Sequence, residues 1–138
     1  MKRRESAPGS ALAWLRHARS DLAVAQARGL IGVLLETLCY HAQQAAEKSI
    51  KAVLVSRGIP PPKTHNLRVL LSLLPQDISV PPRITGAAAL SNYAVEARYP
   101  DAYEPVTEGE YREAVELAAM VLQWAEAIGR EGRSSSNP

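Results

Sequence analysis

Residues 33–56 constrain the fold more than any other part of the chain. Successive residues of an α-helix advance by about 100° around the axis, so the faces of a helical segment can be read from its sequence. One side of this segment carries only apolar or small residues: Leu35, Leu38, Cys39, Ala42, Ala45, Ala46, Ile50 and Val53. Gly32 precedes the segment, and Gly58 with three prolines follows it. The pattern predicts one long helix with two distinct faces.

The opposite side of this predicted helix is a polar arc of roughly 100°. It comprises Tyr40, Gln44, Glu47, Lys48 and Lys51, with His41 at its border. One interpretation is the solvated face of an amphipathic helix, on which Glu47 and Lys51 form an i,i+4 ion pair. The other is a groove in which Lys48 and Lys51 hold a phosphate. This segment alone does not decide between the two interpretations.

Helical periodicity also dominates the rest of the chain. The other predicted helices cover about residues 11–28, 65–74, 82–98 and 107–128. Ser10 is the predicted N-cap of the 11–28 helix, and Thr64 is that of the short 65–74 helix. Thr107 and Glu110 form a capping-box pattern at the start of the last helix. The prediction is an all-α, up-and-down antiparallel bundle of four long helices and one short helix. Residues 10–129 form its single domain, between disordered ends at residues 1–9 and 130–138.

Composition narrows the class of protein. The chain has 138 residues and a formal net charge of +2 with dispersed basic residues, which by itself does not indicate nucleic-acid binding. The single cysteine, Cys39, excludes an internal disulfide and fits a reducing cytosol. No segment approaches the ~20 apolar residues that span a bilayer, so we expect a cytoplasmic protein with no membrane association. One cysteine and three scattered histidines predict no metal site, and no phosphate-binding glycine loop or other cofactor motif occurs.

A second group of cations lies at the start of the short third helix. Lys63, His65 and Arg68 occur there, where the free N–H groups of a helix favour an anion. The preceding loop is short, so this group is expected near the C-terminal end of the 33–56 helix. The alternative role for His65 is a capping or core histidine.

Three blocks in this order and spacing resemble the HEPN domain (higher eukaryotes and prokaryotes nucleotide-binding), in its small stand-alone prokaryotic branch. The blocks are "YHAQQAAEKSIKAVLVSRGI", "KTHNLRVLLSLL" and "LSNYAVEARYPD". The resemblance spans about Leu12 to Trp124 and implies a helical bundle that pairs into a homodimer. It also implies one of two roles. Many such proteins are the partner or nucleotide-binding subunit of a small nucleotidyltransferase encoded beside them, and others are metal-independent ribonucleases, often toxins.

The ribonuclease branch of the family uses an arginine, four to six further residues and a histidine. Here Tyr103 follows Arg98 after four intervening residues, and no histidine follows His65. Tyrosine ionises near pH 10 rather than near 6.5, so it is poorly suited to acid–base work at neutral pH. The sequence therefore predicts a non-catalytic nucleotide-binding or nucleotidyltransferase-partner protein, in a two-gene module of the toxin–antitoxin kind. The alternative is a metal-independent ribonuclease in which Tyr103 replaces the histidine and RNA is the substrate.

The corner "RYPD" completes the predicted site. Pro100 ends the 82–98 helix, and an Arg98–Asp101 pair could serve only to fix that corner. The alternative places Arg98 in the same groove as the lysines, where its guanidinium fork grips phosphate. The candidate nucleotide- or phosphate-binding residues are Tyr40, Gln44, Lys48, Lys51, His65, Arg98 and Asp101.

Overall fold

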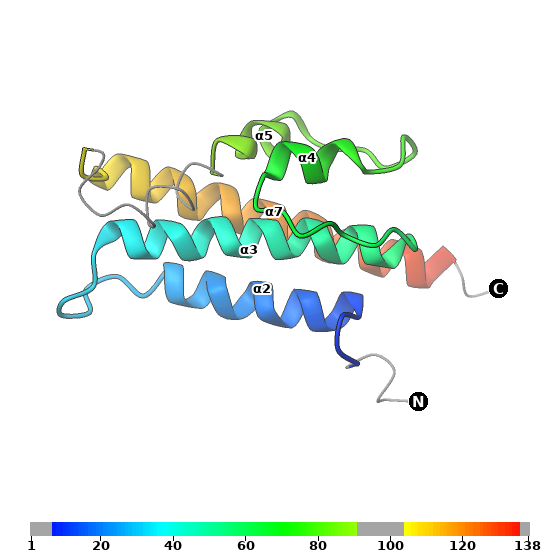
Figure 1. Cartoon of the computed structure of the whole chain (residues 1–138), viewed down its shortest axis with the longest axis horizontal. Coiled ribbons are helices and arrows are strands. Elements are labelled where there is room, and N and C mark those ends of the chain that lie inside the picture. The colour runs from blue at the N-terminus through cyan, green and yellow to red at the C-terminus, as the bar shows by residue number, and fades with distance from the viewer. Residues whose placement is uncertain (1–6, 91–103, 136–138) are drawn as a thin grey trace.

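The computed structural model describes residues 7–90 and 104–135, and every regular element in these ranges is a helix (Figure 1). The long helices are α2 (Ala11–Ala25), α3 (Leu35–Ser56) and α7 (Glu108–Ser135). The short ones are α4 (Leu67–Ser72), α5 (Pro82–Gly86) and the 3-10 helix η1 (Ala87–Leu90). Helix α2 runs antiparallel to α3, whereas α7 runs parallel to α3 because the chain returns between them (Figure 1). The predicted all-α class is confirmed.

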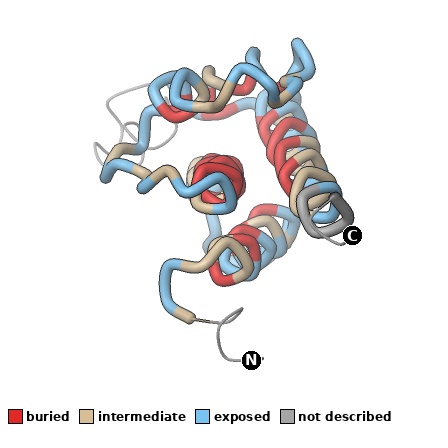
Figure 2. Tube along the Cα trace, turned by 90° about the vertical axis from the view of Figure 1, so that its right-hand side faces the viewer, coloured by how far each residue is buried: buried red, intermediate tan, exposed pale blue. Residues whose placement is uncertain are grey.

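Helix α3 is the central element of the bundle. Helices α2 and α7 and the short α4 all pack against it. Figure 2 shows it end-on in the middle of the molecule and buried around most of its circumference. A helix surrounded in this way must bury its polar side chains together with its apolar ones, and those polar side chains need partners inside the protein.

The helix starts follow local capping chemistry. Ser10 Oγ accepts a hydrogen bond from the Ala13 N–H (3.1 Å) and caps α2 as predicted. The capping box at α7 is also confirmed, because Thr107 and Glu110 exchange hydrogen bonds of 2.9 and 3.1 Å. The predicted cap of α4 is wrong. Asn66 rather than Thr64 caps this helix, since its Oδ1 accepts from the first free N–H groups.

Two predicted helices differ most from the structure, and the other predicted ends differ by three residues or fewer. The 82–98 helix begins at Pro82, but after Gly86 it tightens into η1 instead of continuing as an α-helix. Glycine lowers helix propensity by about 1 kcal/mol, which favours a change of geometry at this position. The part beyond residue 90 lies outside the described residues. Helix α7 continues past the predicted end at Ile128 to Ser135.

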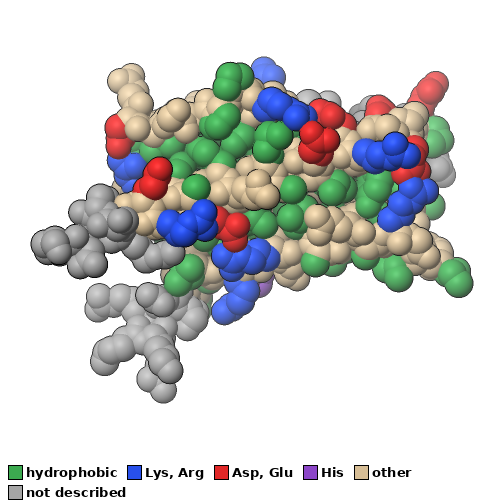
Figure 3. All heavy atoms as spheres, turned by 180° about the vertical axis from the view of Figure 1, so that it is seen from behind, with side chains coloured by type: hydrophobic (Ala, Val, Ile, Leu, Met, Phe, Trp, Pro, Cys, Tyr) green, Lys and Arg blue, Asp and Glu red, His purple; other side chains and the backbone are tan. Residues whose placement is uncertain are grey.

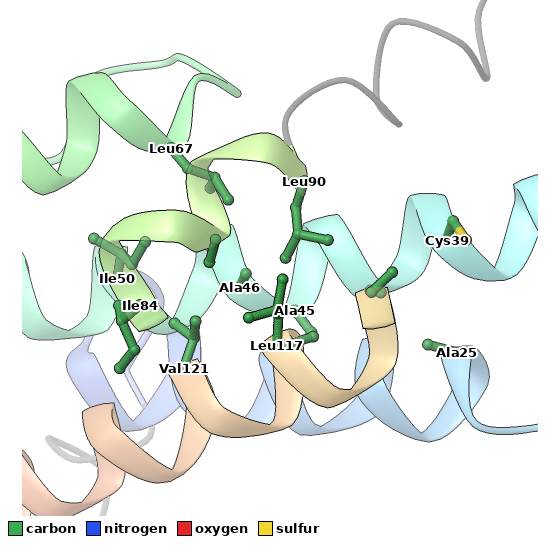
Figure 4. Packing of buried hydrophobic residues seen from close by; sticks show 14 of the residues in the cluster. Ala25, Cys39, Ala45, Ala46, Ile50, Leu67, Ile84, Leu90, Leu117 and Val121 are labelled. Carbon is green, nitrogen blue, oxygen red and sulfur yellow. The ribbon is translucent and has the colours of Figure 1, made fainter. Parts of the chain in front are cut away.

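The main core lies where the short elements cover α3 and α7. Figure 4 shows Leu67, Ile84 and Leu90 pointing toward Leu117 and Val121 of α7 across the small side chains of α3. The alanines at 42, 45 and 46 are fully buried and allow the helices to approach closely. A second cluster joins α2 to α3 and α7 through Leu15, Ala18, Ala52, Val53, Leu122 and Ala125. The predicted apolar side of α3 is therefore confirmed as part of the core.

Candidate functional site

The polar face of α3 is buried rather than solvated. Gln43, Gln44, Glu47, Ser49 and Lys51 are all less than one-tenth exposed. This finding contradicts the interpretation of the arc as an ordinary solvated face. The physical reason is that α2 packs along one side of the arc, while the connection from α3 to α4 is hydrogen-bonded to the other.

Glu47 is the centre of a buried polar cluster on this face. Its Oε2 accepts from Lys51 Nζ at 2.8 Å, and its Oε1 lies 2.9 Å from His65 Nδ1. The Gln43 amide donates to the same Oε1 (3.1 Å) and to the backbone oxygen of His65 (3.0 Å). Gln44 extends the network by donating to the Gln43 oxygen at 2.8 Å. The cluster thus fastens the residue just before the cap of α4 to α3.

Asp21 of α2 forms a second cluster of the same kind. One carboxylate oxygen lies 2.9 Å from His41 Nδ1, and the other accepts from Lys48 Nζ at 2.6 Å. The Tyr40 ring meets the His41 ring edge-on, with 5.5 Å between centroids. In both clusters a carboxylate thus bridges a histidine and a lysine. The positive charge of each lysine is offset by an adjacent negative charge, which lowers its capacity to bind a free anion alone.

Lys51 also connects α3 to the first turn of α2. Its Nζ lies 5.4 Å from the centroid of the Trp14 ring. A cation over an indole is attracted by the negative face of the ring, and the attraction is larger when both groups are removed from water. Lys51 is therefore held by Glu47 and Trp14 together, and only 8% of its side chain is exposed.

The structure brings five of the predicted site residues to this one face of α3. Tyr40, Gln44, Lys48 and Lys51 come from the helix itself, and His65 comes from the adjoining connection. The side chains of Lys48 and His65 remain 23% and 49% exposed, so both can meet a ligand. Gln44 and Lys51 are buried and support the others. Arg98 and Asp101, like Tyr103, lie outside the described residues, so their part in the site stays a prediction.

Sequence reasoning missed Asp21, Gln43 and Trp14 as members of this region. Asp21 was the one with a usable signal. At helical spacing it lies between Ala18 and Ala25, on a small-residue side of the first helix where a carboxylate requires a buried partner. The sequence does not identify that partner, because Lys48 is 27 residues away.

A cavity at one end of the bundle does not coincide with these clusters. It measures about 920 Å³, with Leu12, Leu15 and Trp124 among its lining residues. Arg57, which lines this cavity, is paired with Asp77. None of the predicted site residues within residues 7–90 lines it.

Within residues 7–90 and 104–135, no three histidine, cysteine or acidic side chains come together as a metal site would require. In the same ranges, no helix combines the length and apolar character needed to cross a membrane. On the face shown in Figure 3, several basic side chains lie beside acidic ones. Arg19 Nε, for example, pairs with Glu126 at 2.7 Å in the structure.

Comparison with known proteins places this geometry in a family. The family model of the HEPN domain matches residues 11–128. The crystal structure of TT1696 from Thermus thermophilus is 35% identical in sequence, with a TM-score of 0.78, and the match covers 87% of this chain and 98% of that one. The crystal structure of ST0689, an archaeal HEPN homologue, is 29% identical with a TM-score of 0.68, covering 86% and 96%. No curated protein sequence matches the chain.

Proposed function

Because the chain belongs to the HEPN domain family, we propose that it is a nucleotide-binding HEPN protein that does not cleave RNA on its own. The observation that carries the proposal is that the side chains of Lys48 and His65 are already held in position. Both side chains reach solvent, and each is held by a carboxylate that is itself almost buried. Such pre-positioned donors lose little conformational entropy when a phosphate binds.

The spacing of catalytic residues argues against a ribonuclease of the family's usual kind. Arg98 is followed by Tyr103 where the resemblance implies a histidine. The two histidines on the α3 face, His41 and His65, each place Nδ1 on a carboxylate that also binds a lysine. The His41 contact joins α2 to α3, and the His65 contact fastens the α3–α4 connection to α3. They therefore favour a role in binding and in structure.

Calorimetric titration with ATP tests the proposal. The Lys48→Met and His65→Ala variants are expected to weaken ATP binding by about tenfold or more each, the loss of a hydrogen bond to a charged group. Methionine keeps the aliphatic stem of Lys48 and so limits any effect on packing. Arg112→Ala on α7 is the matched control, because it removes an exposed cation from a different surface. Failure of the wild-type protein to bind ATP would refute the proposal.

The remaining part of the proposal concerns assembly. The family resemblance supports a homodimer and a small nucleotidyltransferase as partner. Light scattering of the purified chain tests the first expectation, and co-purification with the product of an adjacent nucleotidyltransferase gene tests the second. A monomer that ignores such a transferase would leave nucleotide binding as the only proposed role.

A further inference from the structure

A cavity of about 360 Å³ adjoins Lys48 on the side of α2. It is lined by Pro8, Gly9, Ala13, Trp14, Arg16, His17 and Lys48. No residue other than Lys48 in this set belongs to the site predicted from the sequence. Its size falls at the lower end of the range for small-molecule sites, which suits a ligand of mononucleotide size.

The charge of the cavity wall is positive. Arg16 and His17 are exposed, and within residues 7–90 and 104–135 no carboxylate pairs with either of them. Asp21, which offsets the charge of Lys48, does not line the cavity. The first turn of α2 carries no acidic residue, so the positive end of the helix dipole adds to the same field. An anionic group entering the cavity meets the Arg16 guanidinium, whose charge no described carboxylate offsets, and the exposed His17 ring, whose N–H can donate a hydrogen bond.

Local backbone structure shapes the opposite wall. The turn before α2 is closed by a hydrogen bond from the Ser10 N–H to the Ala7 oxygen at 3.0 Å. Gly9 in this turn has a φ of 79°, a left-handed conformation that glycine adopts without strain. This turn places Pro8 and Gly9 beside the small side chain of Ala13, and the space between them stays open.

Trp14 adds a planar apolar surface to the cationic wall. Its indole is partly exposed, and Lys51, anchored on Glu47, fixes it from α3. An aromatic ring beside arginine and lysine is the combination that binds nucleotides, since every base has a π-face and stacking is tolerant of base identity. An inorganic anion or an acidic peptide would use the cations but not the indole.

We infer that the cavity between the start of α2 and Lys48 binds a nucleoside phosphate, with its phosphate on Arg16, His17 and Lys48 and its base against Trp14. The inference rests on the proposed nucleotide-binding function and extends the site onto α2. It assigns ligand contacts to three residues, Trp14, Arg16 and His17, that the sequence pattern did not single out.

The test is calorimetric titration of the full chain with AMP, inorganic pyrophosphate and adenosine. Arg16→Ala is expected to weaken AMP and pyrophosphate binding by about tenfold or more. Trp14→Leu is expected to weaken AMP and adenosine while leaving pyrophosphate unchanged. Arg19→Ala is the matched control: it lies one turn further along α2, pairs with Glu126 and does not line the cavity, so its AMP affinity is expected to equal that of the wild type.

A fluorescence measurement gives an independent readout. The chain has two tryptophans, so Trp124→Phe leaves Trp14 as the single indole. AMP is expected to quench its emission with the affinity found by calorimetry. If AMP binds but Arg16→Ala and Trp14→Leu bind it like the wild type, the site assignment is overturned while the proposed function stands. If the wild type binds neither AMP nor ATP, both are overturned, and if it binds only an RNA oligomer, the mononucleotide assignment is overturned.

Discussion

Removal of the Glu47 carboxylate is expected to be the most destabilising single change on the polar face of α3. Glu47 and Lys51 are joined at 2.8 Å, and their side chains are only 4% and 8% exposed. In Glu47→Ala the Lys51 ammonium stays in a desolvated position without its counter-ion. His65 also loses the carboxylate oxygen that its ring nitrogen Nδ1 contacts. Breaking a buried ion pair from one side costs about 3–5 kcal/mol. A domain of this size has a total stability of about 5–15 kcal/mol, so the loss is a large share of it.

Urea unfolding followed by circular dichroism measures this change. The expected result is a much lower midpoint with an unchanged slope, which signifies lost stability without a change in the surface exposed on unfolding. Glu113→Ala is the control of the same chemistry at an exposed pair, since the Glu113 and Arg83 side chains are about half exposed. Its midpoint is expected to match that of the wild type.

The double variant Glu47→Leu/Lys51→Met separates the charge effect from packing. Replacing both members of a buried pair by apolar residues of similar volume is often neutral or stabilising, so the double variant is expected to recover most of the stability that Glu47→Ala loses. A loss below about 1 kcal/mol in Glu47→Ala would refute the reasoning, because only a well-solvated Lys51 tolerates removal of its partner so easily.

Three further changes test other parts of the fold. Burial raises the pKa of Tyr111 above its ordinary value of 10.0. The unfolded state therefore releases this proton first, and stability from this group is constant below pH 10 and falls as pH rises from 10 toward the higher native pKa. Tyr111→Phe loses the hydrogen bond to the Ala25 oxygen (2.6 Å), so it is expected to be about 1 kcal/mol less stable than the wild type at pH 7. Above pH 10 this difference in the free energy of unfolding is expected to narrow, as urea titrations would show. Thr107→Ala removes the cap of α7 and is expected to lower the free energy of unfolding by about 1 kcal/mol, whereas Thr107→Ser is expected to lower it less. Thermal melts measure both variants, and equal losses of stability would contradict the capping role. Ile50→Ala, at a fully buried position, is expected to cost about 2–5 kcal/mol in urea unfolding, and a loss below about 1 kcal/mol would mean that the core repacks around it.

Much of the fold could be predicted because it depends on local signals. The 33–56 segment was predicted within two residues at its start, since its apolar residues repeat at the helical period and glycines flank it. The capping box at Thr107 and the cap at Ser10 were also predicted, because a cap involves only residues a few positions apart. The cap of α4 was wrong since Thr64 and Asn66 are equally suitable by sequence, and only the backbone geometry selects Asn66.

The candidate site shows the limit of this reasoning. The sequence identified Glu47 and Lys51 as an i,i+4 pair, and this pairing is present in the structure. Both interpretations nevertheless left the polar arc open to water. They missed that Trp14 and the α3–α4 connection, which contains His65, cover this arc. No residue on α3 carries a signal for contacts made by other elements.

The amino-acid sequence by itself determined that the chain is helical, where most of the helices lie and which of their faces are apolar. These properties follow from the periodicity of side chains around one helix and from short-range capping. The tertiary structure alone decided that the polar face of α3 is buried, because Asp21 lies 27 residues from Lys48 and His65 lies 18 residues from Glu47. Side chains so distant in sequence meet only when the helices pack, and that packing converts a polar arc into two buried carboxylate clusters with a cationic cavity beside them.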